Sequence, residues 1–157
     1  MAGENPSAFL PDVATTLNNL GNVLRKLGEK AESRQAFEEA LPIYRQLAEQ
    51  HPAAFLPDVA MTLNNLGAVL RDLGEKAESR QAHEEALEIY LPLAENLPAA
   101  FSGNLNIALR NYVEVAPKDE GDRWWRLWKG LQESKMVGGD NRRGRREKTQ
   151  RGTEKRG

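Results

Sequence analysis

Residues 6–51 read PSAFLPDVATTLNNLGNVLRKLGEKAESRQAFEEALPIYRQLAEQH, and residues 52–97 read PAAFLPDVAMTLNNLGAVLRDLGEKAESRQAHEEALEIYLPLAENL. The two stretches align without a gap and agree at 36 of 46 positions. A third copy opens in register with Pro98-Ala99-Ala100-Phe101 and loses the pattern after Pro117. The chain therefore contains about two and a half copies of one repeat, and the fold follows from that repeat.

The first half of each repeat has the apolar spacing of a helix. From Val13 to Leu27, apolar residues follow one another at steps of four and three, which places them on one stripe. Pro11 and Asp12 suit a first helical turn, and Gly28 is a stop signal. The pattern predicts first helices over residues 11–27 and 57–73, and a third over about 103–116.

The second half of each repeat carries another apolar stripe, which predicts second helices over residues 30–50 and 76–96. Pro42 and Pro92 lie inside these helices and should bend them without ending them. No segment alternates with a period of two residues. Because a helix pair with one stripe on each member cannot close a core, the pairs must stack, and the sequence predicts an all-α α-solenoid of antiparallel helix pairs.

Eight spaced positions resemble the tetratricopeptide repeat family, and most of them recur in the second repeat. In the first repeat they are Leu17, Leu20, Gly21, Leu24, Gly28, Phe37, Ala40 and Leu41. The LNNLG segments and the long repeat look most like the kinesin light chain type. The resemblance covers residues 6–116 and implies a right-handed superhelix that binds proteins or peptides and acts as a non-enzymatic module or scaffold.

Some residues depart from the family pattern. Ser33 and Ser79 stand where the family usually has Ala, and His83 takes the place of Phe37. In the third repeat, Tyr112-Val113 replaces Leu-Gly. We expect close approach to a following helix to be lost there, so that the solenoid ends.

The predicted domain organisation has three parts. Residues 6–121 hold the repeats (6–51, 52–97 and a degenerate 98–121), residues 122–136 form a capping helix, and residues 137–157 form a disordered basic tail. In the capping helix, Trp124, Leu127, Trp128 and Leu131 share one stripe. We expect this stripe to cover the end of the solenoid, although a docking helix or an aromatic platform for single-stranded nucleic acid are alternatives.

Charge is distributed unevenly along the chain. Residues 1–120 carry 10 Lys and Arg against 18 Asp and Glu, whereas residues 121–157 carry 12 against 5. The basic tail could solubilise the chain, fold back on the acidic repeats or bind nucleic acid through its arginines. A further alternative is that the chain is a fragment of a larger tetratricopeptide signalling protein.

The resemblance implies a ligand groove on the concave face lined by the first helices. The candidate peptide-binding residues there are Asn18, Asn19, Asn22, Arg25, Asn64, Asn65, Arg71, Arg110 and Asn111. Asparagine carries donors and an acceptor on a short side chain, so a line of them suits the backbone of an extended peptide, and arginines suit acidic groups. The structural alternative is that Asn19, Asn65 and Asn111 cap or bridge neighbouring helices and that Asn18 is a solvated surface residue.

Composition excludes several classes of function. The chain has no Cys, and its two His residues, His51 and His83, lack the spacing of metal ligands. We find no catalytic motif, no metal site and no cofactor site, and we expect no enzyme activity. The mean hydropathy of −0.65, the lack of an uninterrupted apolar span and the lack of a signal peptide predict a cytoplasmic protein without a membrane partner.

The N-terminal repeat is expected to leave one face open. Nothing obvious before Pro11 would cover the first helix, and the open surface should include part of the Val13, Leu17 and Leu24 neighbourhood. An exposed apolar patch of this kind tends to find a partner. We therefore expect self-association through the first repeat or marginal stability as a monomer.

Overall fold

The structure is a computed structural model that describes residues 6–133. Its elements are η1 (Pro6–Phe9), α1 (Leu10–Lys26), α2 (Lys30–Gln50), α3 (Pro52–Asp72), α4 (Lys76–Asn96) and α5 (Pro98–Val115), and a further helix occupies residues 118–133. No strand occurs within this range, so the predicted all-α class is confirmed. The chain divides into an N-terminal part ending at Gly121 and a C-terminal part beginning at Asp122.

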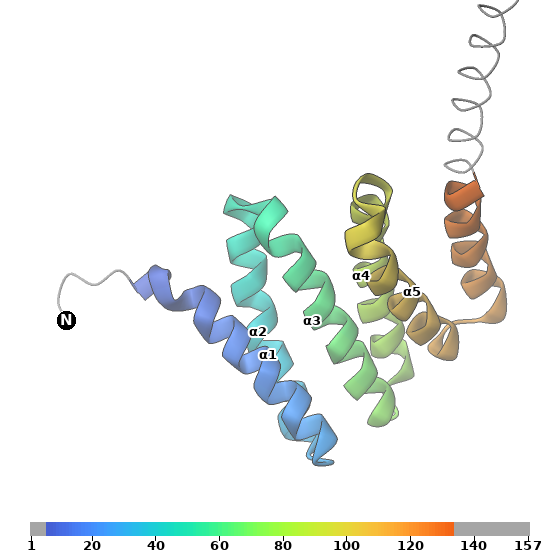
Figure 1. Cartoon of the computed structure of the whole chain (residues 1–157). Helices are drawn as coiled ribbons and strands as arrows, with labels where there is room; N and C mark the ends of the chain where they lie inside the picture. The colour runs from blue at the N-terminus through green and yellow to red at the C-terminus, as the bar shows by residue number, and fades with distance from the viewer. Residues whose placement is uncertain (1–5, 134–157) are drawn as a thin grey trace, which may run out of the picture. The chain divides into compact units, whose positions relative to one another are not determined.

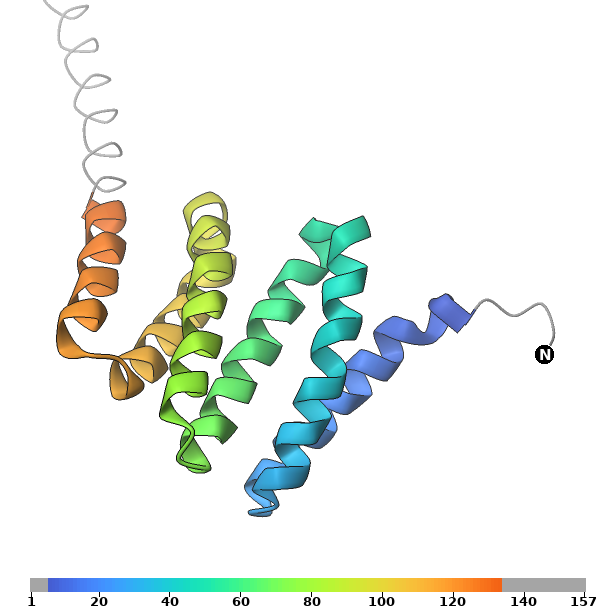
Figure 2. The ribbon, with the colours of Figure 1, turned by 180° about the vertical axis from the view of Figure 1, so that it is seen from behind.

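The N-terminal part is built by successive packing of helices along the chain. Helix α1 packs on α2, α2 on α3, α3 on α4 and α4 on α5. The first helices of the repeats also touch one another, α1 with α3 and α3 with α5. They form one layer (Figure 1), and α2 and α4 form the other (Figure 2). This is the stacked arrangement of helix pairs that the repeat predicts.

Glycine ends the first helix of each full repeat. Gly28 and Gly74 both have φ of 83°, in the left-handed region that favours glycine. The next residue closes the turn, because the backbone N–H of Glu29 donates to the Leu24 carbonyl at 2.9 Å. The same bond joins Glu75 to Leu70. These turns reverse the chain within three residues and make each helix pair antiparallel.

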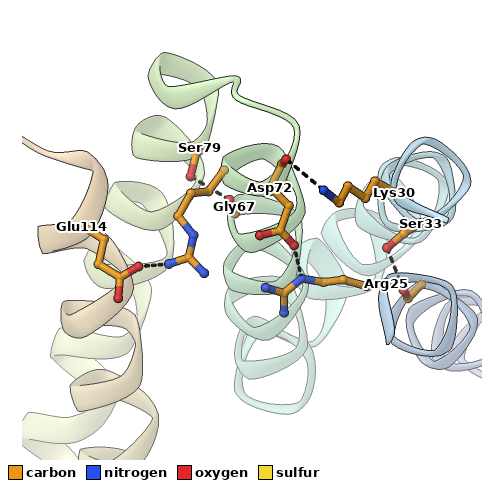
Figure 3. Close-up of polar contacts among 9 residues, drawn as sticks. Arg25, Lys30, Ser33, Gly67, Asp72, Ser79 and Glu114 are labelled. Atoms are coloured by element: carbon orange, nitrogen blue, oxygen red, sulfur yellow. Dashed lines mark hydrogen bonds and ion pairs between the residues drawn. The ribbon is translucent and has the colours of Figure 1, made fainter. Parts of the chain in front are cut away.

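A second glycine lets the two helices of a pair approach closely. A Cβ atom on Gly21 would lie 2.6 Å from the Phe37 ring, and one on Gly67 would lie 2.7 Å from the His83 ring. The serine that replaces the usual alanine uses the same contact, since buried Ser33 donates to the Gly21 carbonyl at 2.7 Å. Ser79 does so to Gly67 at 2.6 Å (Figure 3). The ring and the hydroxyl therefore lock the second helix onto the first.

Three helices begin earlier than expected. Helices α3 and α5 begin at Pro52 and Pro98 rather than at residues 57 and 103, and the last helix begins at 118 rather than 122. Proline is favoured in a first turn, and Pro52 and Pro98 occupy that place, so the expectation that Pro57 marks the start of its helix was wrong. Helices α2 and α4 continue through Pro42 and Pro92, as predicted.

The degenerate third repeat keeps a close helix approach that we expected it to lose. Val113 replaces the glycine of α5, but the following helix supplies one, because a Cβ atom on Gly121 would lie 2.8 Å from Val113 Cγ1. The Tyr112 hydroxyl donates to Glu120 at 3.1 Å beside it. In this repeat the larger residue lies on the first helix and the glycine lies on the helix that follows, so the close contact persists with the two roles reversed.

Helix α3 is long and apolar enough, by length and composition, to cross a membrane. Half of its most apolar window is buried within the protein, where α2 and α4 pack against it. The core helix of a water-soluble protein has the same composition, so a single helix of this kind is weak evidence for a membrane span. The predicted absence of a membrane partner stays a prediction.

Candidate functional site

Asparagine side chains join neighbouring first helices on the layer formed by α1, α3 and α5. Asn18 of α1 is buried, and its Oδ1 accepts hydrogen bonds from Asn65 Nδ2 at 3.3 Å and from the Thr62 hydroxyl at 3.4 Å. The arrangement recurs one repeat later, where Asn64 Oδ1 accepts from Asn111 Nδ2 at 3.2 Å. We call these four residues, Asn18, Asn65, Asn64 and Asn111, the asparagine ladder.

Asn64 receives its second hydrogen bond from a different kind of residue than Asn18 does. The residue of α5 equivalent to Thr62 is Ala108, which has no hydroxyl to give to Asn64. His83 of α4 supplies the missing donor, with its Nδ1 2.9 Å from Asn64 Oδ1. The substitution of Phe37 by a histidine in the second repeat therefore keeps two donors on the ladder oxygen.

His83 is fully buried, and this changes its titration. Desolvation lowers its pKa from 6.5 to about 4, with the charges of Arg71 and Arg25 adding to the effect. Because the amide oxygen of Asn64 can only accept, His83 Nδ1 must carry the proton in this arrangement. Its Nε2 then presents a buried lone pair, for which the described residues offer no hydrogen-bond partner.

Ion pairs tie the C-terminal ends of the first helices together. Arg25 Nε donates to Asp72 Oδ2 at 2.8 Å, and Arg71 pairs with Glu114 (Figure 3). Lys30 adds a hydrogen bond to the Asp72 carbonyl at 3.4 Å. Both arginines predicted to receive acidic ligand groups thus already have a carboxylate partner.

Two cations near this layer stay open to a ligand. Lys26 and Arg110 are exposed and form no ion pair within residues 6–133. A cavity of about 330 Å³ lies beside Lys26 and is lined by Asn22, Arg25, Lys26 and Asp72. With two cations and one carboxylate, this cavity favours an anionic group.

The predicted site residues divide into two groups. Asn65 and Asn111 bridge helices, and Asn18 is buried rather than solvated or open to a ligand. Asn19 and Arg110 are exposed, while Asn22 and Asn64 are half-buried.

Sequence reasoning missed three contacts between helices of this layer and its neighbours, made by Thr62, His83 and Glu114. The aligned repeats carried a signal for Thr62 and His83. One repeat further along, Thr62 is replaced by Ala108 and Phe37 is replaced by His83, so the hydroxyl is lost where the imidazole is gained. Glu114 has no equivalent cue, because the pairs Arg25–Asp72 and Arg71–Glu114 have different spacings. Ion pairs between helices depend on side-chain reach, which periodicity does not report.

The C-terminal part is described by itself. In it Trp128 is buried, Trp124, Trp125 and Leu131 are half-buried, and Leu127 is exposed, so the predicted stripe is not uniformly covered. The expectation that this helix caps the solenoid stays a prediction. The basic tail, residues 137–157, lies outside the described residues. Within residues 6–133, no group of three or more His, Asp or Glu side chains is placed to hold a metal ion.

Antiparallel helix pairs, each closed by a glycine contact and stacked on the next pair along the chain, define a helical-repeat protein. The family model described as tetratricopeptide repeat matches residues 12–91. The chain therefore belongs to the tetratricopeptide repeat family, whose repeats generally mediate protein–protein interaction or scaffolding and are typically not enzymes. No curated protein matches the chain significantly. The kinesin light chain-like type stays a prediction.

Proposed function

We propose that the chain is a non-enzymatic interaction module that holds a peptide segment of a partner protein against the layer of α1, α3 and α5. The observation that carries the proposal is the asparagine ladder. It crosses three helices and places amide groups in line, and Asn64, Asn65 and Asn111 are only half-buried. Each of these amides has donor positions that the ladder bonds leave unused, and Asn65 and Asn111 have acceptor positions as well.

The chemistry of the surface favours a peptide with acidic side chains. A peptide backbone offers carbonyl and N–H groups at regular intervals, which the unused positions of the amides could bond without reading the side chains. Lys26 and Arg110 lie exposed on α1 and α5, and the cavity at Asn22 has a net positive lining. Because the receptor layer is preformed by packing, binding would cost it little conformational entropy.

A peptide selection with matched variants tests this proposal. A library of random peptides would be selected on the full chain, and the binders titrated against N22A/R110A and against Q46A/K76A. The first variant removes an amide and a cation from the proposed groove, and the second removes the same kinds of group from exposed positions of α2 and α4. We expect the groove variant to lose at least about tenfold in affinity and the control to lose little. Binders that are unaffected by N22A/R110A would contradict the groove.

A further inference from the structure

One face of α1, together with the residue directly before it and the residue directly after it, exposes a line of mainly apolar side chains. Phe9, Val13, Leu20, Val23 and Leu27 are between 44% and 70% exposed, and Thr16 is exposed among them. We call these six residues the α1 seam. At ~100° per residue they fall within about 80° of one another on the helix surface. Three of the five residues in the apolar stripe predicted for this helix, Val13, Leu20 and Leu27, are thus exposed, and the buried positions of α1 are instead Ala14, Asn18 and Gly21.

The second repeat shows what this surface is built to do. Val13 is 44% exposed whereas its equivalent Val59 is 2% exposed, and Val23 is 53% exposed whereas Val69 is fully buried. Helix α3 has a preceding helix, α2, packed against it, and α1 has none among the described residues (Figure 1). Identical side chains on equivalent helices are therefore covered in one case and open in the other.

The seam is self-complementary. Its residues recur at steps of four and three with a seven-residue repeat, which is the spacing along which two helices pack side by side. When two copies are laid antiparallel, Phe9 lies opposite Leu27 and Val13 opposite Val23. Thr16 lies opposite Leu20, so that every apolar residue meets a seam residue of the other copy.

The charges beside the seam select the antiparallel direction. Asp12 and Lys26 are exposed, and neither forms an ion pair within residues 6–133. An antiparallel arrangement brings Asp12 of each copy to Lys26 of the other, whereas a parallel one brings like charges to the same level. We propose that the chain forms a twofold symmetric dimer in which the α1 seam pairs antiparallel with the α1 seam of a second copy.

Pairing through the seam leaves the proposed groove accessible. Asn22 and Arg25 lie on other faces of α1, about 140° to 160° from the centre of the seam at ~100° per residue. Lys26 is shared by the two proposals, because it also lines the cavity at Asn22, but Asn22 and Arg110 take no part in the seam. The peptide test on N22A/R110A and the dimer test on V13D therefore fail or succeed separately. The dimer would present two grooves to a partner with two copies of the binding segment, which strengthens binding without any new contact.

Light scattering on the full chain, measured over a wide range of concentrations, tests the dimer. We expect a concentration-dependent dimer that V13D weakens about tenfold or more, because a carboxylate would be buried between apolar side chains. Circular dichroism would check that the variant keeps its helix content, as expected for an exposed position. A chain that stays monomeric at every concentration, or a dimer indifferent to V13D, would overturn the proposal.

A charge swap tests the direction of pairing. D12K and K26D should each weaken the dimer, and the D12K/K26D double variant should recover it, since opposite charges again meet across the pair. Both changes oppose the helix dipole, so recovery in the double variant could not come from a better helix. E32K, which reverses an acidic residue in the first turn of α2, is the matched control and should leave the dimer unchanged. A double variant that stays weak, or a dimer lost on truncation after Glu133, would overturn the antiparallel seam.

Discussion

His83 Nδ1 lies 2.9 Å from Asn64 Oδ1 and so links the interior of the second repeat to the asparagine ladder on its surface. The same ring fills the space above Gly67 that Phe37 fills above Gly21. One side chain therefore both packs the helix pair and supplies a hydrogen bond. At Asn18, the equivalent of Asn64, these two tasks are divided between Phe37 of the first repeat and Thr62 of the second.

The role of His83 can be tested by placing at positions 83 and 108 the residues found at the equivalent positions 37 and 62, Phe and Thr. H83F should leave Asn64 Oδ1 with the Asn111 bond alone, and A108T should supply a hydroxyl at the position equivalent to Thr62. In a double-mutant cycle measured by urea unfolding, we expect the free energy of unfolding of the double variant to be about 0.5–1.5 kcal/mol higher than the two single effects predict when added. A108V has the shape of threonine without its hydroxyl and should show no such coupling with H83F.

The stability of the chain should depend on pH through His83. The folded state binds a proton on this ring only near pH 4, whereas the unfolded chain binds it near 6.5. Stabilisation from this group is therefore present above about pH 6.5 and is lost as the pH falls towards 4, by up to about 3 kcal/mol. The free energy of unfolding of the wild type and H83F, measured across this range, should diverge, and parallel curves would show that the ring is not buried as described.

Glycine at position 21 should be intolerant of a side chain. A Cβ atom there would meet the Phe37 ring at 2.6 Å, so we expect G21A to cost about 1–3 kcal/mol through overpacking. Gly103 of α5 is the control, because a Cβ atom on it would meet nothing within 4 Å. G103A should stabilise the helix by up to about 1 kcal/mol, and the two urea midpoints should move in opposite directions.

Adjacent asparagines should behave differently on truncation. N18A removes a buried acceptor and leaves the Asn65 amide and the Thr62 hydroxyl without it, so we expect a loss of about 1–3 kcal/mol. Asn19 is exposed, and N19A should change stability by less than about 0.5 kcal/mol. Equal effects of the two substitutions on thermal unfolding would show that the ladder contributes nothing to stability.

The sequence predicted the repeats and helix pairs because packing between them obeys a period that can be read along one chain. Gly21 and Phe37 were both singled out as family positions, and the structure brings them together, since one helix must give room where the other is large. The ladder could not be assigned, because Asn18 and Asn19 differ by about 100° on the helix and only the crossing of α1 over α3 decides which is covered. The contact of Gly121 with Val113 could not be predicted either, because Gly121 belongs to no repeat pattern.

Ion pairs join neighbouring helices in both layers of the repeats, and the amide bonds of the asparagine ladder are added in the layer of first helices. On the outer surface, Arg34 reaches Glu78 at 3.0 Å and Arg45 reaches Glu85 at 2.6 Å, both as partly exposed pairs between α2 and α4. The first helices also share partly exposed ion pairs, but they are joined in addition by short amides, one of them buried. Long exposed ion pairs yield easily and weaken with salt, whereas short buried bonds do not. A bending force on the array should therefore be absorbed between α2 and α4, and the face that would meet a partner keeps its spacing under load.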